Sequence, residues 1–206
     1  MRISILLGAL TLAPALAFAQ DPPRLYAGAA AGLLTTFPFS NYSRTQVGPA
    51  GVVGVQLSPR WALQTGVQLF WDKSTYSYSY YSGSGSFTTS TSESRSTFLL
   101  VPLLARLTLT NPGQRLQVDL LGGGSWLHSQ TRYSYSYGGV ATRDNSSYSY
   151  NGAALQLGPQ VRYRLGQALD LTASVPVLGE LTGGGNFGDR LALAPQLGAQ
   201  YVFGGR

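Results

Sequence analysis

The segment Trp61–Trp71 places an apolar stripe between two tryptophans, and it constrains the fold more than any other stretch of the chain. Its odd positions are mostly apolar, whereas its even positions are small or polar with the exception of Phe70. A period of two is typical of a β-strand with two different faces. Ten residue steps at about 3.3 Å, tilted by about 40°, rise roughly 25 Å, which is the apolar height of an outer-membrane barrel between its aromatic girdles. The segment predicts such a barrel if the rest of the chain repeats it.

Seven further segments show the same alternation, with apolar residues on one parity. The eight predicted strands are 25–34, 47–57, 61–71, 97–109, 116–127, 153–164, 169–178 and 191–203. Their connections alternate between short turns and longer polar segments, which is the pattern of short periplasmic turns and long external loops. The sequence therefore predicts an all-β fold, an eight-stranded antiparallel transmembrane β-barrel in the outer membrane with its N- and C-termini periplasmic.

Alternation alone leaves open which face of the barrel is outside. A soluble barrel would turn its leucine-rich face inward and show its polar face to water. The interior of an eight-stranded barrel is just wide enough for side chains to fill, and the Gly, Ala, Gln, Ser and Thr parity fits that space better than Leu, Trp and Tyr. We therefore expect the leucines to face lipid. The aromatic girdles are then predicted to be Trp61, Tyr163, Tyr201 and Phe203 on the periplasmic side and Trp71 and Trp126 on the outer side.

Four prolines lie inside predicted strands, where each removes a hydrogen-bond donor from the sheet. They are Pro102, Pro159, Pro176 and Pro195. A closed barrel has no free edge on which to place them, so we expect local bulges or missing hydrogen bonds at these positions.

The first residues are typical of an export signal. Arg2 gives a positive start, residues 3–16 form an apolar stretch, and Ala17-Phe18-Ala19 matches a cleavage site. Residues 1–19 are thus predicted to be a cleaved signal peptide, and residues 20–206 the barrel domain. The chain has no cysteine, which excludes disulfides and cysteine metal sites. Only 11% of its residues are charged, against about 25% in soluble domains. The net charge of +6 comes from scattered residues, so we expect contact with outer-membrane lipids and not with nucleic acid.

The chain resembles the outer-membrane β-barrel family of Bacteroidetes-type bacteria, whose members are described as porin-family or OmpA-like barrels. The best marker is the run Leu99-Leu100-Val101-Pro102-Leu103-Leu104-Ala105-Arg106, and the segments Gly122-Gly123-Gly124 and 158–163 are similar to later glycine-rich strands of the family. The last strand departs from the usual ending, because Gly204-Gly205-Arg206 follows Phe203 where an aromatic residue is usually last. The resemblance implies export, insertion by the barrel-assembly machinery as a partner, and no common catalytic residue.

Charged residues of lumen parity are expected to pair, because an unpaired buried charge is costly. A hairpin centred on Asn111-Pro112-Gly113 places Arg106 opposite Asp119, and a hairpin centred on Gly166 places Arg162 opposite Asp170. These pairs are interpreted as a structural plug of the lumen. The alternative is a gate or ion path.

Tyrosine–serine repeats in the connections after the third and fifth strands are the most unusual composition of the chain. Their period of two predicts that the strands continue as hairpins outside the membrane, with Tyr on one face and Ser on the other. Tyrosine and serine are good contact residues, so these repeats are a candidate external contact surface for an unidentified ligand; the alternative is an extension without a specific ligand. The tyrosines concerned are Tyr76, Tyr78, Tyr80, Tyr81, Tyr133, Tyr135, Tyr137, Tyr148 and Tyr150.

No catalytic, cofactor or metal site is predicted. His128 and Ser129 are adjacent on a predicted strand and point to opposite faces, so they cannot form a nucleophile–base pair with each other. The sequence therefore favours a structural or surface-interaction role without catalysis. The alternatives are a narrow passive channel, a lipid-modifying outer-membrane enzyme and a secreted soluble β-barrel.

Overall fold

The computed structural model describes residues 23–36, 44–82, 86–137, 140–182 and 190–204, which form one antiparallel sheet closed into a ring. The predicted signal peptide lies outside the described residues and stays a prediction. Six long strands come first: β1 (Arg24–Thr36), β2 (Arg44–Gln56), β3 (Trp61–Ser82), β4 (Ser86–Thr108), β5 (Leu116–Tyr137) and β6 (Val140–Arg164). Four shorter strands follow: β7 (Leu169–Ser174), β8 (Val177–Glu180), β9 (Leu191–Leu193) and β10 (Gln196–Val202).

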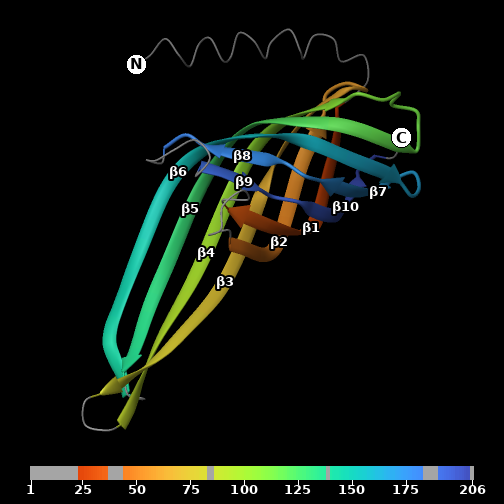
Figure 1. Cartoon of the computed structure of the whole chain (residues 1–206). Helices are drawn as coiled ribbons and strands as arrows, with labels where there is room; N and C mark the ends of the chain where they lie inside the picture. The colour runs from red at the N-terminus through yellow and green to blue at the C-terminus, as the bar shows by residue number, and fades with distance from the viewer. Residues whose placement is uncertain (1–22, 37–43, 83–85, 138–139, 183–189, 205–206) are drawn as a thin grey trace, which may run out of the picture.

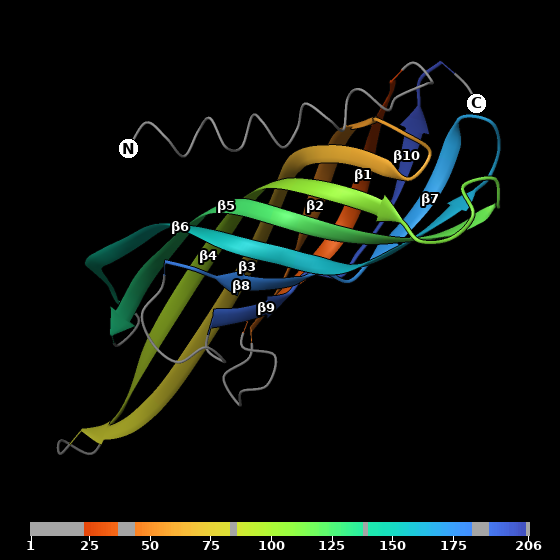
Figure 2. The ribbon, with the colours of Figure 1, turned by 90° about the horizontal axis from the view of Figure 1, so that it is seen from above.

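The ring has eight strand positions, because β7 and β8 share one position and β9 and β10 share the next. β6 pairs with both β7 and β8, and β1 pairs with both β10 and β9. Figure 2 shows β8 next to β6 and β9 on the other side of β8, where β9 completes the circuit toward β1. The eight-stranded antiparallel barrel predicted from the sequence is confirmed. Among the described residues, no helix is long and apolar enough to cross a membrane.

The prolines inside the predicted strands have two different effects. Pro102 and Pro159 lie within uninterrupted strands, β4 and β6. Pro176 and Pro195 stand where β7 is separated from β8 and β9 from β10, because proline cannot donate to the sheet. The neighbouring carbonyl groups still accept hydrogen bonds; the Ala194 N–H, for example, donates to the Pro176 oxygen at 3.0 Å. The barrel thus closes across two short breaks, which confirms the expectation at Pro176 and Pro195. Opposite Pro102 the pairing of β3 with β4 skips Gly66 and Val67, whereas at Pro159 the pairing of β5 with β6 is continuous.

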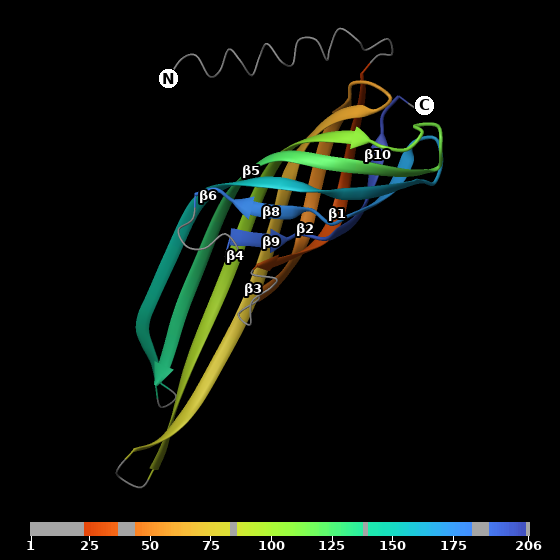
Figure 3. The same cartoon turned by 45° about the horizontal axis from the view of Figure 1, so that its top comes forward.

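The two ends of the barrel differ. At one end, which we call the turn end, short connections join β2 to β3, β4 to β5 and β6 to β7, and both the start of β1 and the end of β10 lie there (Figure 3). The opposite end, the hairpin end, carries the other connections. From there β3, β4, β5 and β6 continue well past their shorter neighbours as a four-stranded extension, seen at the lower left of Figure 1.

Side-chain burial shows which face of the barrel is outside. The apolar parity points outward, and its side chains form an exposed band that includes Leu103, Leu155 and Leu197. The opposite parity points into the lumen, where Gln64, Gln156 and other small or amide side chains are buried. The leucine-rich face is therefore the outer one, because the lumen has room only for the smaller set.

Candidate functional site

A buried ion-pair network fills the lumen near the turn end. Arg162 of β6 binds the Asp119 carboxylate of β5 with two nitrogens, Nε to Oδ2 at 2.5 Å and Nη2 to Oδ1 at 3.0 Å. The same Nη2 donates to the Thr108 hydroxyl at 3.1 Å, and Nη1 lies 3.6 Å from the Asp170 carboxylate. Both carboxylates are almost fully buried. Bidentate, charge-assisted hydrogen bonds of this kind are strong and fix the geometry of the two side chains.

The predicted register was wrong at both hairpins and Arg106 does not pair with Asp119, although all four charged residues do lie in the lumen and the predicted Arg162–Asp170 pair is present at 3.6 Å. Thr108 stands opposite Asp119, so Arg106 is displaced from that carboxylate by two positions. Likewise Arg164 stands opposite Asp170, and Arg162 reaches Asp170 only diagonally. Both errors shift the register by two residues, and a shift of two leaves every side chain on its predicted face.

The cause of the first error lies in the turn between β4 and β5. The tight turn is centred as expected, with the Gln114 N–H donating to the Asn111 oxygen at 3.1 Å. The chain then enters β5 late, because the Leu109 N–H pairs with the Val118 oxygen while the Thr110 hydroxyl accepts from the Val118 N–H. Between these two backbone hydrogen bonds, one residue on the β4 side, Thr110, lies opposite three on the β5 side, residues 115–117. The register of the two strands therefore shifts by two residues.

Arg106 occupies a separate position from the ion-pair network. Its side chain is 1% exposed. Its Nη2 donates to Gln56 at 2.7 Å, and its guanidinium lies 4.6 Å from the centre of the Tyr26 ring, a cation–π distance. Within the described part of the chain, its Nε and Nη1 have no hydrogen-bond partner.

An apolar layer closes the lumen nearer the hairpin end. Phe70 and Leu100 are fully buried there, and they pack with residues from four other strands and from the link between β9 and β10. The layer consists of Leu34, Phe70, Leu100, Leu127, Ala154, Leu178 and Ala194. A layer of apolar side chains thus lies across the lumen on its hairpin-end side.

The four-stranded extension beyond the barrel carries the tyrosine–serine repeats. We call the face that continues the lumen wall its inner face, and the face that continues the lipid-facing wall its outer face. Even positions of β3 point inward, as the buried Phe70 shows, and the register runs unbroken from Gln68 to Ser82. The tyrosines with inner-face parity are Tyr76, Tyr78, Tyr80, Tyr133, Tyr135, Tyr137, Tyr148 and Tyr150. The predicted hairpins and the separation of Tyr from Ser are thus confirmed.

Tyr81 is the exception, because its parity places it on the outer face. Its ring meets Phe87 edge to face at 5.6 Å, next to the end of the hairpin. It is therefore separate from the other tyrosines.

Four inner-face tyrosines form a row of rings. The ring centres of Tyr76 and Tyr78 are 6.1 Å apart, those of Tyr78 and Tyr80 6.0 Å, and those of Tyr80 and Tyr137 6.1 Å. A hydrogen bond with Tyr137, helped by burial, raises the pKa of Tyr80 to about 12. The Tyr80 phenol therefore stays neutral at physiological pH. Most of these rings are open to solvent; Tyr76 is 67% exposed.

The outer face of the extension is built from hydroxyls and charges. Ser77 pairs with Thr91 at 3.0 Å, and Ser79 with Thr89 at 2.9 Å, so a row of hydroxyl groups holds β3 to β4.

Closer to the barrel, Glu93 accepts from Lys73 at 3.0 Å and from Arg95 at 2.6 Å. The hydrogen bond from Lys73 has the larger effect and that from Arg95 the next, and together they hold the pKa of the Glu93 carboxyl below its usual value. Arg132 stands beside Arg95 on the next strand. Charge thus gathers on the outer face and aromatic surface on the inner one.

The six predicted girdle residues all point outward and are about half exposed. Trp61, Tyr163, Tyr201 and Phe203 lie toward the turn end, and Trp71 and Trp126 toward the hairpin end. Their contact with lipid stays a prediction.

His128 lies on the outer wall of the barrel. Its ring stacks on Trp126, with 6.1 Å between ring centres, and its Nδ1 pairs with the Asn151 side chain at 2.8 Å. Among the described residues, no cluster of three or more His, Asp or Glu side chains could hold a metal ion.

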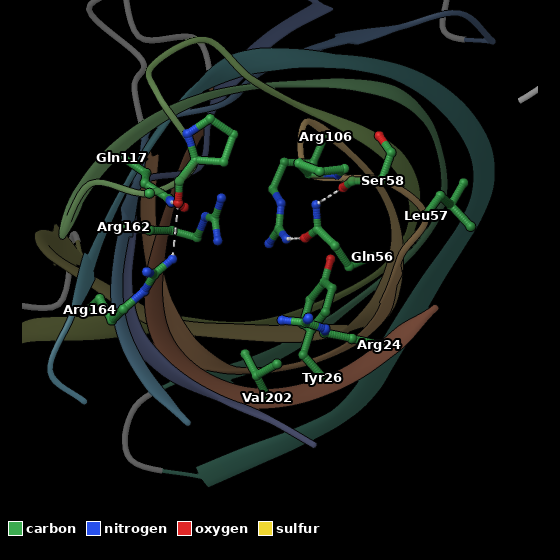
Figure 4. A pocket seen from close by; sticks show the side chains of 13 residues that line it. Arg24, Tyr26, Gln56, Leu57, Ser58, Arg106, Gln117, Arg162, Arg164 and Val202 are labelled. Carbon is green, nitrogen blue, oxygen red and sulfur yellow. Dashed lines mark hydrogen bonds between the residues drawn. The ribbon is translucent and has the colours of Figure 1, made fainter. Parts of the chain in front are cut away.

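Sequence reasoning missed several residues at the turn end. Tyr26, Gln56, Arg24 and Arg164 all line a cavity there with Arg106 (Figure 4). A signal was present, because Tyr26 shares the lumen parity of the first strand and Arg164 shares that of Arg162.

A closed eight-stranded ring, an apolar outer band and a filled lumen together define an integral outer-membrane β-barrel. The family model described as outer membrane protein beta-barrel domain matches residues 4–203. The chain belongs to this family, and its place is accordingly the cell outer membrane.

Solved structures agree on the fold. The barrel resembles Ail, the attachment invasion locus protein of Yersinia pestis, solved in complex with the heparin analogue sucrose octasulfate (12% identity, 88% of this chain and 97% of that chain, TM-score 0.54). It also resembles a major outer membrane protein of Thermus thermophilus (16% identity, 89% and 100% covered, TM-score 0.51). No curated protein sequence matches this chain. At these identities the likeness concerns the fold alone.

Proposed function

We propose that this protein is a surface-interaction protein of the outer membrane, whose hairpin end projects outside the cell and whose turn end opens to the periplasm. In this proposal, the tyrosines on the inner face of the extension bind an extracellular ligand. The observation that carries it is the row of solvent-exposed rings formed by Tyr76, Tyr78, Tyr80 and Tyr137.

The row has the physical properties of a contact surface. Tyrosine offers a large, stiff, amphipathic surface that loses little conformational entropy when it is bound. Here the rings are also held by a sheet, so their spacing is set before a ligand arrives. An extension needed only for solubility has no requirement to place eight tyrosines on one face.

The chemistry of the inner face favours a neutral ligand. Among its residues with described side chains, Asp72 is the one charged residue, and Lys73, Arg95 and Arg132 all lie on the outer face. Ail was solved with a sulfated sugar analogue, which is a ligand suited to basic residues. We expect this inner face to stack on uncharged rings, such as those of a neutral oligosaccharide, and not to select sulfated ones.

The basic row on the outer face also supports the position of the barrel in the membrane. Lys73 is the next residue of β3 after Trp71 whose side chain is on the outer face. Arg95 lies opposite Lys73 on β4, and Arg132 lies opposite Arg95 on β5. Basic side chains just beyond an aromatic girdle lie at the depth of anionic lipid headgroups. The outer-membrane lipids are thus proposed partners of this row.

Binding to an array of neutral and sulfated oligosaccharides tests the proposal. The test variant replaces Tyr76, Tyr78 and Tyr137 by Ser, and the matched control replaces the outer-face residues Ser77 and Ser79 by Ala. We expect the wild-type barrel in nanodiscs to bind neutral members, and the tyrosine variant to lose binding about tenfold or more, since aromatic anchors dominate such interfaces. Absence of wild-type binding, or an equal loss in the control, would reject the proposed function.

A further inference from the structure

A cavity of about 290 Å³ opens into the lumen at the turn end, and its walls are strongly basic. Arg24, Arg106, Arg162 and Arg164 line it, and none of its described lining residues is acidic. Figure 4 shows the Arg106 and Arg162 side chains directed toward the centre of this space. A volume of this size equals about ten water molecules at ~30 Å³ each, which is enough for a small anionic group and its substituent.

The carboxylates behind the cavity neutralise only part of this charge. Asp119 and Asp170 both engage Arg162. Arg24, Arg106 and Arg164 form no salt bridge with a described residue. Among the described residues that face the lumen here, four arginines and two carboxylates thus leave a charge of +2.

The hydrogen-bond donors of Arg106 are also only partly satisfied. This side chain is almost fully buried, yet Nε and Nη1 have no partner within the described residues. Arg164 donates Nη2 to the Pro112 oxygen at 3.2 Å, while its Nε also has no partner there. A buried guanidinium without a counter-charge is costly, so the site is suited to an added anion.

We propose that this cavity binds a phosphate group. Guanidinium groups match phosphate oxygens through paired N–H donors, and the local charge of +2 balances a dianionic phosphate. Gln56 and Tyr26 are neutral members of the wall, and their donor groups already serve the Ser58, Trp61 and Gln64 oxygens. The phosphate belongs either to a small soluble molecule or to a lipid headgroup. Its binding does not depend on the tyrosine surface proposed above; only the statement that the cavity opens to the periplasm rests on that orientation.

Calorimetric titration of the purified full barrel in a maltoside detergent tests the site. One arm uses inorganic phosphate, and the other uses micelles doped with phosphatidic acid. The test variants are Arg106→Gln and Arg164→Gln, of which the second lies nearer the cavity mouth and spares the buried network. The control is Arg44→Gln at the start of β2, which lies outside both the cavity and the basic row. Heat-modifiable gel mobility checks that each variant is folded.

We expect wild-type protein to bind one of the two probes with a dissociation constant of about 1 mM or lower, and each cavity variant to weaken that binding about tenfold. The probe that binds identifies the source of the phosphate. The control should bind like wild type. Failure of both probes up to about 10 mM, or binding unchanged in folded Arg164→Gln and Arg106→Gln, would overturn the proposal.

Discussion

Removal of the Asp119 carboxylate should be among the most destabilising single changes in this barrel. Asp119 is fully buried and accepts two hydrogen bonds from Arg162. In Asp119→Ala, the Arg162 guanidinium keeps only the 3.6 Å contact with Asp170 and the bond to Thr108. Breaking a buried ion pair from one side costs about 3–5 kcal/mol. We expect a loss of that size in the free energy of unfolding.

A double-mutant cycle identifies the partner of Asp119. Reversible urea unfolding in lipid vesicles, followed by tryptophan fluorescence, gives the free energies for Asp119→Ala, Arg162→Ala, Arg106→Ala and the two double variants. The direct contact predicts a coupling of about 1.5–3 kcal/mol between Asp119 and Arg162. The coupling between Asp119 and Arg106 should be less than half as large, because the register separates them. A larger coupling to Arg106 than to Arg162 would refute the assignment.

Three further predictions concern the extension, the barrel wall and the lumen. The Tyr80 pKa of about 12 lies above the ordinary value of 10, so the Tyr80–Tyr137 hydrogen bond stabilises the hairpins fully below pH 10 and is lost as the pH rises through 12. The variant Tyr137→Phe should lower the Tyr80 pKa in an ultraviolet titration. An unchanged Tyr80 pKa would contradict this. Gly66→Ala should destabilise the barrel by about 1–3 kcal/mol, because the added methyl group collides with the Gly51 carbonyl oxygen. The control Gly124→Ala places its methyl group in open space and should leave the stability unchanged. Equal losses of stability in urea unfolding would contradict the close approach of the two strands at Gly66. Planar-bilayer recordings should show no sustained conductance through the apolar layer; stable open channels would show that the lumen is not closed.

The fold was predictable from the sequence because its main determinant is local. Alternation with a period of two decides which side chains face lipid, and segments such as 97–109 carry that pattern without help from their neighbours. Continuation of β3 to β6 beyond their shorter neighbours was also predictable, because the Tyr–Ser repeats keep the same period. The aromatic surface could therefore be predicted from the sequence. That it lies on the inner face was known only once the structure showed Phe70, which shares its parity on β3, to be buried in the lumen.

The contacts inside the lumen were less predictable, since they depend on turn conformation. Thr110 and Asn111 use their side chains to cap the backbone, and this delays the entry into β5. Such a delay changes the partner of Asp119 and leaves its face unchanged. The basic cavity escaped prediction for a related reason, because Arg24 and Arg164 come from strand ends far apart in the sequence and meet only when the ring closes.

Cysteine labelling of intact cells tests the central claim, which is a barrel that displays its tyrosine-bearing extension outside the cell. The chain has no natural cysteine, so Ser79→Cys on the extension and Gln114→Cys at the turn end each introduce a single thiol. We expect a membrane-impermeant maleimide to label position 79 on intact cells, and position 114 only after the outer membrane is permeabilised. Labelling of position 114 on intact cells, with position 79 protected, would contradict the account.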